Sequence, residues 1–206
     1  MGIFNSYNMS NRNAMLFDKI RKDIHRKQEN YVLKKRFFNR YIKILLQHGT
    51  IAVVFFRFGN MAYSSRQPYR GVLIAFFWLL QPVFSWFTGV YIDPRTSIGS
   101  GFVIHNFSSI NIEAESIGEH FTINQDVYVG ESWERNGKPV LGRNVFMGCG
   151  SKILGPVTIG DNVVVAANAV VLKDVASNCM AVSVPALVIS KHITDDYVKT
   201  VPAHSV

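Results

Sequence analysis

The sequence has few cysteines, and we expect no signal peptide. Its 206 residues include only 2 cysteines, Cys149 and Cys179. Two cysteines make neither a disulfide framework nor a metal-ligand cluster, so we expect no metal cofactor. The N-terminus mixes isolated apolar residues with Asn, Ser and charges, unlike a signal peptide. These absences favour the reducing cytoplasm.

Charge is also missing from residues 71–92, which contain no Asp, Glu, Lys or Arg. The segment meets the roughly 20-residue criterion for a membrane span. Gln81 and Pro82 interrupt it, so we favour helices in the membrane surface or at a subunit interface. A span or re-entrant segment and a buried helical core remain alternatives.

Basic residues crowd the chain before residue 44 and account for much of the formal charge of +8. A basic arm next to aromatic-rich helices is what an interfacial anchor needs, which predicts peripheral attachment to the inner face of a membrane. The aromatic residues form apolar runs instead of alternating with basic ones. That arrangement argues against nucleic acid as a partner.

What the sequence does contain is a six-residue repeat of aliphatic side chains. One phase includes Ile92, Ile98, Ile104 and Ile110, and after a one-residue slip a second phase runs from Ile117 to Val171. An even period suits strands, where alternate side chains share a face, and it does not match a helix of 3.6 residues per turn. Hexapeptide periods are typical of a parallel β-helix.

The repeat divides the chain into three parts. We expect a basic and apolar helical region over residues 1–90, broken at Gly49 and Gly59, then a β-helix over 91–190 and a tail over 191–206. The loop 131–139 interrupts the repeat, and its polar slot is Arg135. A loop on a rigid scaffold is a common place for binding residues. With three hexads per coil, Asn111, Gly130, Gly148 and Ala166 are predicted to share one column, bare enough for a ligand to approach the backbone.

The motifs "IGSGFVIHN", "VYVGES" and "KPVLGRNVFMGCGSKILGPVTIGDNVVVAANAVVLKDV" resemble the left-handed β-helix acyltransferases. Within them the sequence is similar to the serine acetyltransferases and their relatives in polysaccharide gene clusters, over residues 91–190. The resemblance implies acetyl-CoA as donor, a hydroxyl acceptor, a homotrimer and active sites between neighbouring prisms.

The resemblance places the catalytic histidine at His105, which would take the proton of the acceptor hydroxyl. Imidazole titrates near working pH, so it suits this task. The matching CoA-binding positions are Gly130, Gly148, Ala166 and Ala167, and Lys152 and Lys173 are candidates to neutralise its phosphates. Candidate acceptor contacts are Asn106, Glu131, Trp133 and Lys138. The residue that orients His105 stays open among Glu113, Glu115 and Asp126.

The sequence departs from the serine acetyltransferase pattern at three positions. Ile104 replaces an aspartate, Lys138 replaces a second histidine, and Tyr91 replaces an acidic residue. We therefore expect an O-acetyltransferase acting on a hydroxyl of a polysaccharide or lipid-linked sugar. The alternatives are a serine O-acetyltransferase of cysteine synthesis and a non-catalytic β-helix scaffold.

Overall fold

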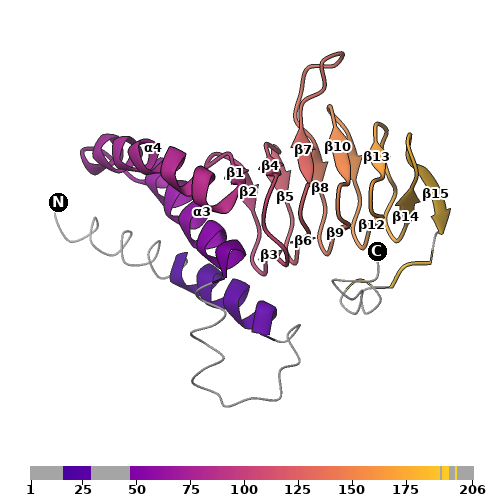
Figure 1. Cartoon of the computed structure of the whole chain (residues 1–206), viewed down its shortest axis with the longest axis horizontal. Helices are drawn as coiled ribbons and strands as arrows, with labels where there is room; N and C mark the ends of the chain where they lie inside the picture. Colours follow the sequence, from indigo (N-terminus) through magenta and orange to yellow (C-terminus); the bar gives the residue numbers. More distant parts are fainter. Residues whose placement is uncertain (1–15, 29–46, 191, 195–197, 199–206) are drawn as a thin grey trace, which may run out of the picture.

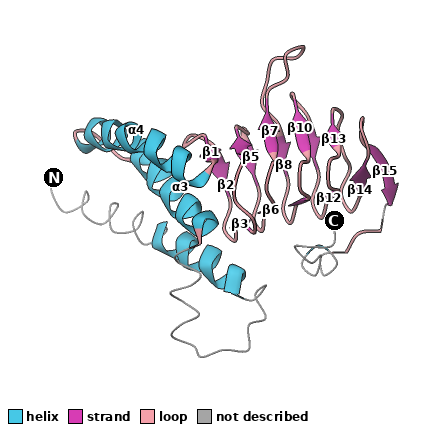
Figure 2. Ribbon diagram, viewed as in Figure 1, coloured by secondary structure: helices cyan, strands magenta, loops and turns pink. Residues whose placement is uncertain are grey.

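A helical segment leads into a long coil of short strands (Figures 1 and 2). The computed structural model describes residues 16–28, 47–190, 192–194 and 198. Predictions made for residues 1–15, for 29–46 and for most of the tail lie outside the described residues. The described part opens with a helix over residues 16–28, and the division at residue 90 into separate domains stays a prediction.

Two further helices form a hairpin: α3 (His48–Ser64) and α4 (Tyr69–Thr88). The prediction that Gly59 breaks the helical segment is wrong, because it lies inside α3; Gly49 lies in the first turn of that helix, and the residues before Gln47 lie outside the described residues. A Cβ at Gly59 would overlap the ring of Phe77, so this glycine allows α4 to pack closely. Helix α4 runs through Pro82 and ends where Gly89 adopts a left-handed φ of 64°.

The strands form three sheets along the coil. The 5-stranded sheet has the order β1-β4-β7-β10-β13, the 4-stranded sheet β11-β8-β5-β2, and the 6-stranded sheet β15-β14-β12-β9-β6-β3. The strands are β1 (Val90–Ile92), β2 (Ser97–Ile98), β3 (Val103–Ile104), β4 (Ile110–Ile112), β5 (Ser116–Ile117), β6 (Thr122–Ile123), β7 (Tyr128–Gly130), β8 (Val140–Leu141), β9 (Phe146–Met147), β10 (Lys152–Leu154), β11 (Thr158–Ile159), β12 (Val164–Val165), β13 (Val170–Val171), β14 (Met180–Val182) and β15 (Leu187–Ser190).

All the strand pairs are parallel except β14 with β15, so the predicted parallel β-helix with a helical N-terminal region is confirmed. The inward side chain of each strand stacks on the next coil, as Ile104, Ile123 and Met147 do in the 6-stranded sheet. These three side chains are fully buried. Burying an aliphatic side chain contributes about 1.5–3 kcal/mol, so the repeat is the main stabilising feature of the coil.

The predicted column of Asn111, Gly130, Gly148 and Ala166 is wrong. Val129 in β7 and Leu141 in β8 belong to consecutive strands, so the slot at Arg135 fills no side of the prism. Instead, the loop 131–139 leaves at the corner between these strands and projects from the solenoid (Figure 1). Counting the loop as a side shifted all earlier strands by one sheet relative to the later ones.

Buried charges attach the helices to the first coil. Arg57 of α3 donates to Asp23 Oδ2 at 2.9 Å and to the carbonyl oxygen of Ile98 at 2.7 Å, and Asp23 accepts from the backbone N–H of Phe102 at 2.8 Å. Arg26 donates to the carbonyl oxygen of Gly101. Arg26 therefore contacts the coil, and its buried guanidinium is not available to the expected membrane-binding arm.

Candidate active site

The predicted site residues lie at two corners of the prism. The His105 corner comprises the segments that follow strands of the 6-stranded sheet: residues 105–109, 124–127, 148–151 and 166–169. The Lys138 corner comprises the segments between the 5-stranded and 4-stranded sheets: residues 93–96, 113–115, 131–139, 155–157 and 172–174.

His105 directly follows β3 and is half-buried, so its imidazole lies at the rim of the coil and not inside it. Its backbone N–H donates to the carbonyl oxygen of Ile123, which continues the strand register into the corner. Asn106 is half-buried beside it. This placement leaves the imidazole accessible to a substrate, as a general base requires.

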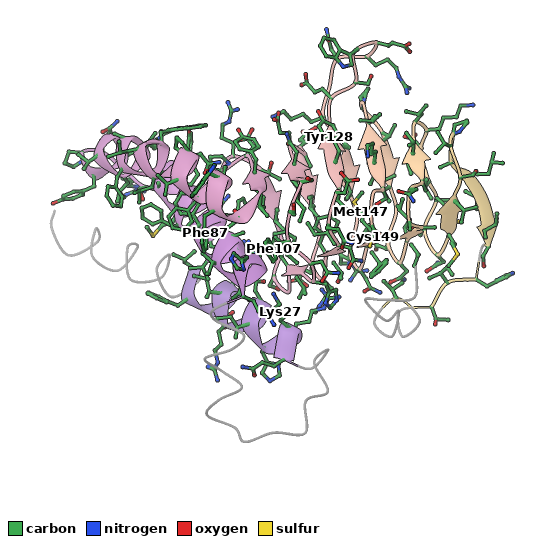
Figure 3. The ribbon with its side chains drawn as sticks, viewed as in Figure 1. Lys27, Phe87, Phe107, Tyr128, Met147 and Cys149 are labelled. Carbon is green, nitrogen blue, oxygen red and sulfur yellow. The ribbon has the colours of Figure 1, made fainter. Side chains whose placement is uncertain are left out.

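Aromatic rings close one side of the His105 corner. The ring of Phe107 stacks on His48, with centroids 4.2 Å apart, and His48 also contacts Phe87 at 4.8 Å. Figure 3 shows Phe107 and Phe87 where the helices meet the coil. The start of α3 therefore forms a wall next to the segment that carries His105.

Small residues continue the column that begins with His105. Gly148 and Ala166 follow strands β9 and β12 in the same sheet, with Ala167 after them. A Cβ on Gly148 would lie 2.5 Å from the backbone nitrogen of Ala167, so close packing of coils explains this glycine. Ala166 and Ala167 are half-buried. Lys152 is directed back to this corner, because its Nζ donates to the carbonyl oxygen of Gly150 at 3.2 Å.

Asn124 belongs to the same column and was not predicted as a site residue. Its side chain is fully buried, and Nδ2 donates to the carbonyl oxygen of Met147 at 3.3 Å. Its Oδ1 has no hydrogen-bond partner among the described residues. The signal in the sequence was a polar side chain at the slot after an inward aliphatic, which the incorrect column assignment concealed.

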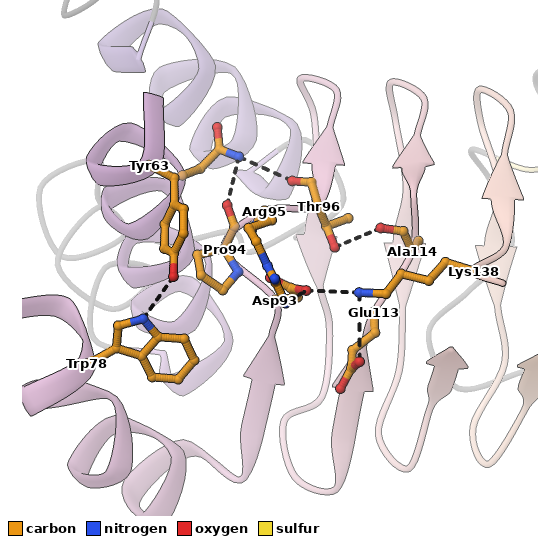
Figure 4. Close-up of polar contacts among 10 residues, drawn as sticks. Tyr63, Trp78, Asp93, Pro94, Arg95, Thr96, Glu113, Ala114 and Lys138 are labelled. Atoms are coloured by element: carbon orange, nitrogen blue, oxygen red, sulfur yellow. Dashed lines mark hydrogen bonds and ion pairs between the residues drawn. The ribbon is translucent and has the colours of Figure 1, made fainter. Parts of the chain in front are cut away.

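A network of charges occupies the Lys138 corner (Figure 4). Lys138 Nζ lies 3.0 Å from Asp93 Oδ2 and 3.9 Å from Glu113 Oε2. Arg95 adds a second ion pair to Asp93 at 3.0 Å. Burial raises the pKa of the Asp93 carboxyl, but hydrogen bonds from Arg95 and Lys138 outweigh this and bring the pKa to about 2. Asp93 is therefore a fixed negative charge at neutral pH.

Lys138 and Glu113 keep part of their side chains accessible, with exposed fractions of 28% and 36%, whereas Asp93 is only 3% exposed. The corner thus presents both signs of charge to solvent above a buried carboxylate. Burial and the nearby Asp93 raise the pKa of the Tyr91 hydroxyl, which keeps that side chain neutral.

The other predicted residues of this corner stand further out. Gly130 ends β7 and is buried, and Glu131 and Trp133 are exposed in the loop that follows. The Arg135 guanidinium fastens the loop by donating to the carbonyl oxygen of Leu172 at 2.6 Å. Lys173 is exposed beside this attachment.

The structure thus separates residues that were expected to form one site. His105, Asn106, Gly148, Lys152, Ala166 and Ala167 lie at the His105 corner, and Gly130, Glu131, Trp133, Lys138 and Lys173 lie at the Lys138 corner. Among the candidates to orient His105, Asp126 shares its corner, whereas Glu113 and Glu115 lie at the other.

The fold and the repeat define a class of hexapeptide-repeat transferases. Residues 138–173 match the family model described as bacterial transferase hexapeptide (six repeats). A serine acetyltransferase of Synechococcus elongatus is 35% identical over 149 residues, which cover 71% of this chain and 59% of that enzyme. One from Helicobacter pylori is 32% identical over 159 residues, covering 74% of this chain and 88% of that enzyme.

The solved structure of a serine acetyltransferase from Brucella abortus superimposes with a TM-score of 0.74 at 25% identity, covering 91% of this chain and 74% of that chain. The chain belongs to the serine acetyltransferase family of left-handed β-helix acyltransferases. Membership confirms the expectation of an acetyl-CoA-dependent O-acetyltransferase.

The expectation of a polysaccharide or lipid-linked sugar acceptor is wrong, because the similar proteins point to serine instead. Both sequence relatives and the solved structure are serine acetyltransferases. The argument from the departure at position 104 also loses its basis in the structure. Ile104 is fully buried in the core, so this side chain points into the coil and not toward an acceptor. Near position 91, the carboxylates of Asp93 and Glu113 lie 3.0 and 3.9 Å from Lys138 Nζ, so this corner carries acidic side chains at other positions.

Proposed function

We propose that this protein transfers the acetyl group of acetyl-CoA to the side-chain hydroxyl of L-serine. The similarity to serine acetyltransferases supports this assignment. The observation that carries it is a pair of opposite charges, Lys138 and Glu113. Both side chains are partly exposed, and Lys138 Nζ lies 3.9 Å from Glu113 Oε2. Free serine is a zwitterion, so it needs one cationic and one anionic partner, whereas a neutral sugar hydroxyl needs neither.

The site is completed by a second copy of the chain. His105 and Lys138 lie at different corners of one prism, so a single copy does not bring base and charged pair to one acceptor. In a homotrimer of prisms, the His105 corner of one copy faces the Lys138 corner of the next. Cyclic symmetry then repeats the same composite site at each interface.

In this arrangement His105 takes the proton of the serine hydroxyl as the oxygen attacks the thioester carbonyl carbon. A tetrahedral oxyanion forms, and its collapse breaks the carbon–sulfur bond and releases CoA as a thiolate, which receives the proton from the imidazolium. The donor extends along Gly148, Ala166 and Ala167, with Lys152 near its phosphates. Lys138 holds the carboxylate of serine and Glu113 its ammonium.

The first test measures thiol release from acetyl-CoA with serine and with two truncated acceptors. Ethanolamine lacks the carboxylate, and 3-hydroxypropionate lacks the ammonium. Lys138→Met should raise KM for serine about 10- to 100-fold, which corresponds to the free energy of one charge-assisted hydrogen bond. It should not raise KM for ethanolamine, which has no carboxylate. Glu113→Gln should likewise raise KM for serine but not for 3-hydroxypropionate, which has no ammonium.

The second variant is His105→Ala, which should lower kcat about 10²- to 10⁴-fold with the fold intact by circular dichroism. Turnover of glycan acceptors with no turnover of serine would overturn the proposed acceptor. Full activity of His105→Ala would overturn the proposed base.

A further inference from the structure

Helix α4 exposes a continuous apolar face that the proposed function does not use. Val72, Leu79, Val83 and Trp86 have exposed fractions of 71%, 73%, 61% and 88%, and Phe76 reaches 51%. Their spacing places them on one side of the helix. The helix lies on the outer side of α3 at the end of the molecule away from β15 (Figure 1). Exposed apolar patches of this kind mark interaction sites.

The opposite side of α4 packs on α3, so the exposed face is not a core face turned outward. Phe55 of α3 stacks on Phe84 with centroids 3.9 Å apart and on Phe77 at 4.8 Å. Even so, only 17% of the most apolar 18-residue window of α4 is buried, at a mean hydropathy of 1.6. A core helix of a soluble protein would be mostly buried.

The charged side chains of α4 and of the turn that precedes it are all basic. The sequence has no Asp or Glu between Glu29 and Asp93. Arg66 and Arg70 are exposed at the start of α4, at the turn of the helical hairpin. An anionic surface matches this combination of exposed cations and apolar side chains. A second copy of α4 offers no carboxylate to pair with either arginine.

The attachments of α4 fix how it meets such a surface. Gln81 Nε2 donates to Ser85 Oγ at 3.0 Å, and Ser85 Oγ donates to the carbonyl oxygen of Val90 at 3.3 Å. These polar groups lie toward the coil, and Gly89 connects the helix directly to β1. Held along one side by α3 and at its end by the coil, α4 offers only its outer face. That geometry suits a helix lying in the interface and not one that crosses the bilayer.

We propose that the outer face of α4 docks the protein on an anionic lipid surface. Val72, Phe76, Leu79, Val83 and Trp86 enter the boundary between headgroups and acyl chains, and Arg66 and Arg70 contact the headgroups. The membrane is an address for the enzyme and takes no part in the chemistry, so the two proposals stand or fall separately.

The test is co-flotation of the full chain with phosphatidylcholine vesicles that contain or lack phosphatidylglycerol. The protein should float with the anionic vesicles. Leu79→Glu should lower the fraction bound about tenfold or more, since it removes an apolar side chain that would enter the membrane and adds a charge that anionic headgroups repel. Leu187→Glu is the matched control, because Leu187 is 65% exposed on β15 at the other end of the molecule. It should bind like the wild type.

A second readout uses Trp86, in a Trp78→Phe/Trp133→Phe background that removes the two other tryptophans. Its emission should shift to the blue with anionic vesicles and be quenched by brominated acyl chains. Thiol release should be equal in the wild type and in Leu79→Glu, which verifies that the variant folds. Failure of the wild type to float, or equal flotation of Leu79→Glu and the wild type, would overturn the proposal. So would a Leu79→Glu variant that changes only the oligomeric mass, since the face would then cover another copy.

Discussion

Replacing Arg57 by methionine should sharply destabilise the protein. The Arg57 side chain is 1% exposed, and its guanidinium donates to both carboxylate oxygens of Asp23, at 2.9 and 3.3 Å. It also donates to the carbonyl oxygens of Ile98 and Gly99, at 2.7 and 2.6 Å. Removing one partner of a buried ion pair costs about 3–5 kcal/mol, because the other charge stays buried without compensation. The total free energy of unfolding of a typical domain is about 5–15 kcal/mol, so this loss is a large part of it.

Urea unfolding followed by circular dichroism measures this loss. Arg143→Met is the matched control, since Arg143 is 70% exposed and pairs with Asp161 at 3.0 Å. That surface pair should contribute about 0–1 kcal/mol. The double variant Asp23→Leu/Arg57→Met should recover part of the stability, because no unpaired charge remains. A loss below about 1 kcal/mol for Arg57→Met would refute the reasoning.

Three further predictions concern stability. Burial lowers the pKa of Lys27 to about 8, whereas the unfolded chain keeps the ordinary value of 10.5. Between these two pH values the unfolded chain binds more protons than the folded one, so the free energy of unfolding should rise with pH. Lys27→Met should abolish this rise and, at pH 7, increase the free energy of unfolding in urea by about 2 kcal/mol. The Asp93 pKa of about 2 lies below the ordinary 3.8, so its contribution is present above pH 3.8 and lost as the pH falls toward 2. Lys138→Met should raise that pKa in an NMR titration of the carboxyl carbon. A Cβ on Gly118 would lie 2.6 Å from the carbonyl oxygen of Gly142, so Gly118→Ala should lower the free energy of unfolding by about 1–3 kcal/mol. A Cβ on Gly71 meets nothing within 4 Å, so Gly71→Ala should raise the free energy of unfolding by about 0.5–1 kcal/mol; thermal unfolding measures both changes.

The sequence predicted the coil well, because the repeat is a direct consequence of the geometry. Each inward aliphatic stacks on its equivalent in the next coil, so Ile153 and Val171 recur at the interval that one turn requires. The same reasoning failed for columns. Residues added at a corner, such as the loop 131–139, leave the aliphatic phase intact while changing which sheet each strand joins.

The candidate site could be predicted only in part, for a related reason. His105 stood out through its motif and its slot after an inward aliphatic. The pairing of Asp93 with Lys138 joins residues separated by 45 positions, and no local pattern indicates it. The burial of Arg26 and Lys27 was equally hidden, because their partners are backbone and side-chain groups of other elements. The unbroken α3 shows that a glycine in a helical pattern can serve packing instead of ending the helix.

The sequence alone did not show which way the side chains at the departing positions point, so these departures were over-interpreted. Position 104 looked like a lost acceptor contact, yet Ile104 is part of the hydrophobic core. Charge at the site was then counted at the wrong positions. Glu113, weighed as a partner for His105, in fact lies near Lys138 at another corner.

The most direct test of the composite active site is complementation between two impaired variants. His105→Ala and Lys138→Met are co-expressed so that both enter the same assemblies, and kcat/KM for serine is compared with that of each variant alone. In a randomly mixed trimer about a quarter of the interfaces combine an intact His105 with an intact Lys138, so activity should recover to about that fraction of the wild type. Activity no higher than the mean of the separate variants would contradict a site shared between neighbouring copies.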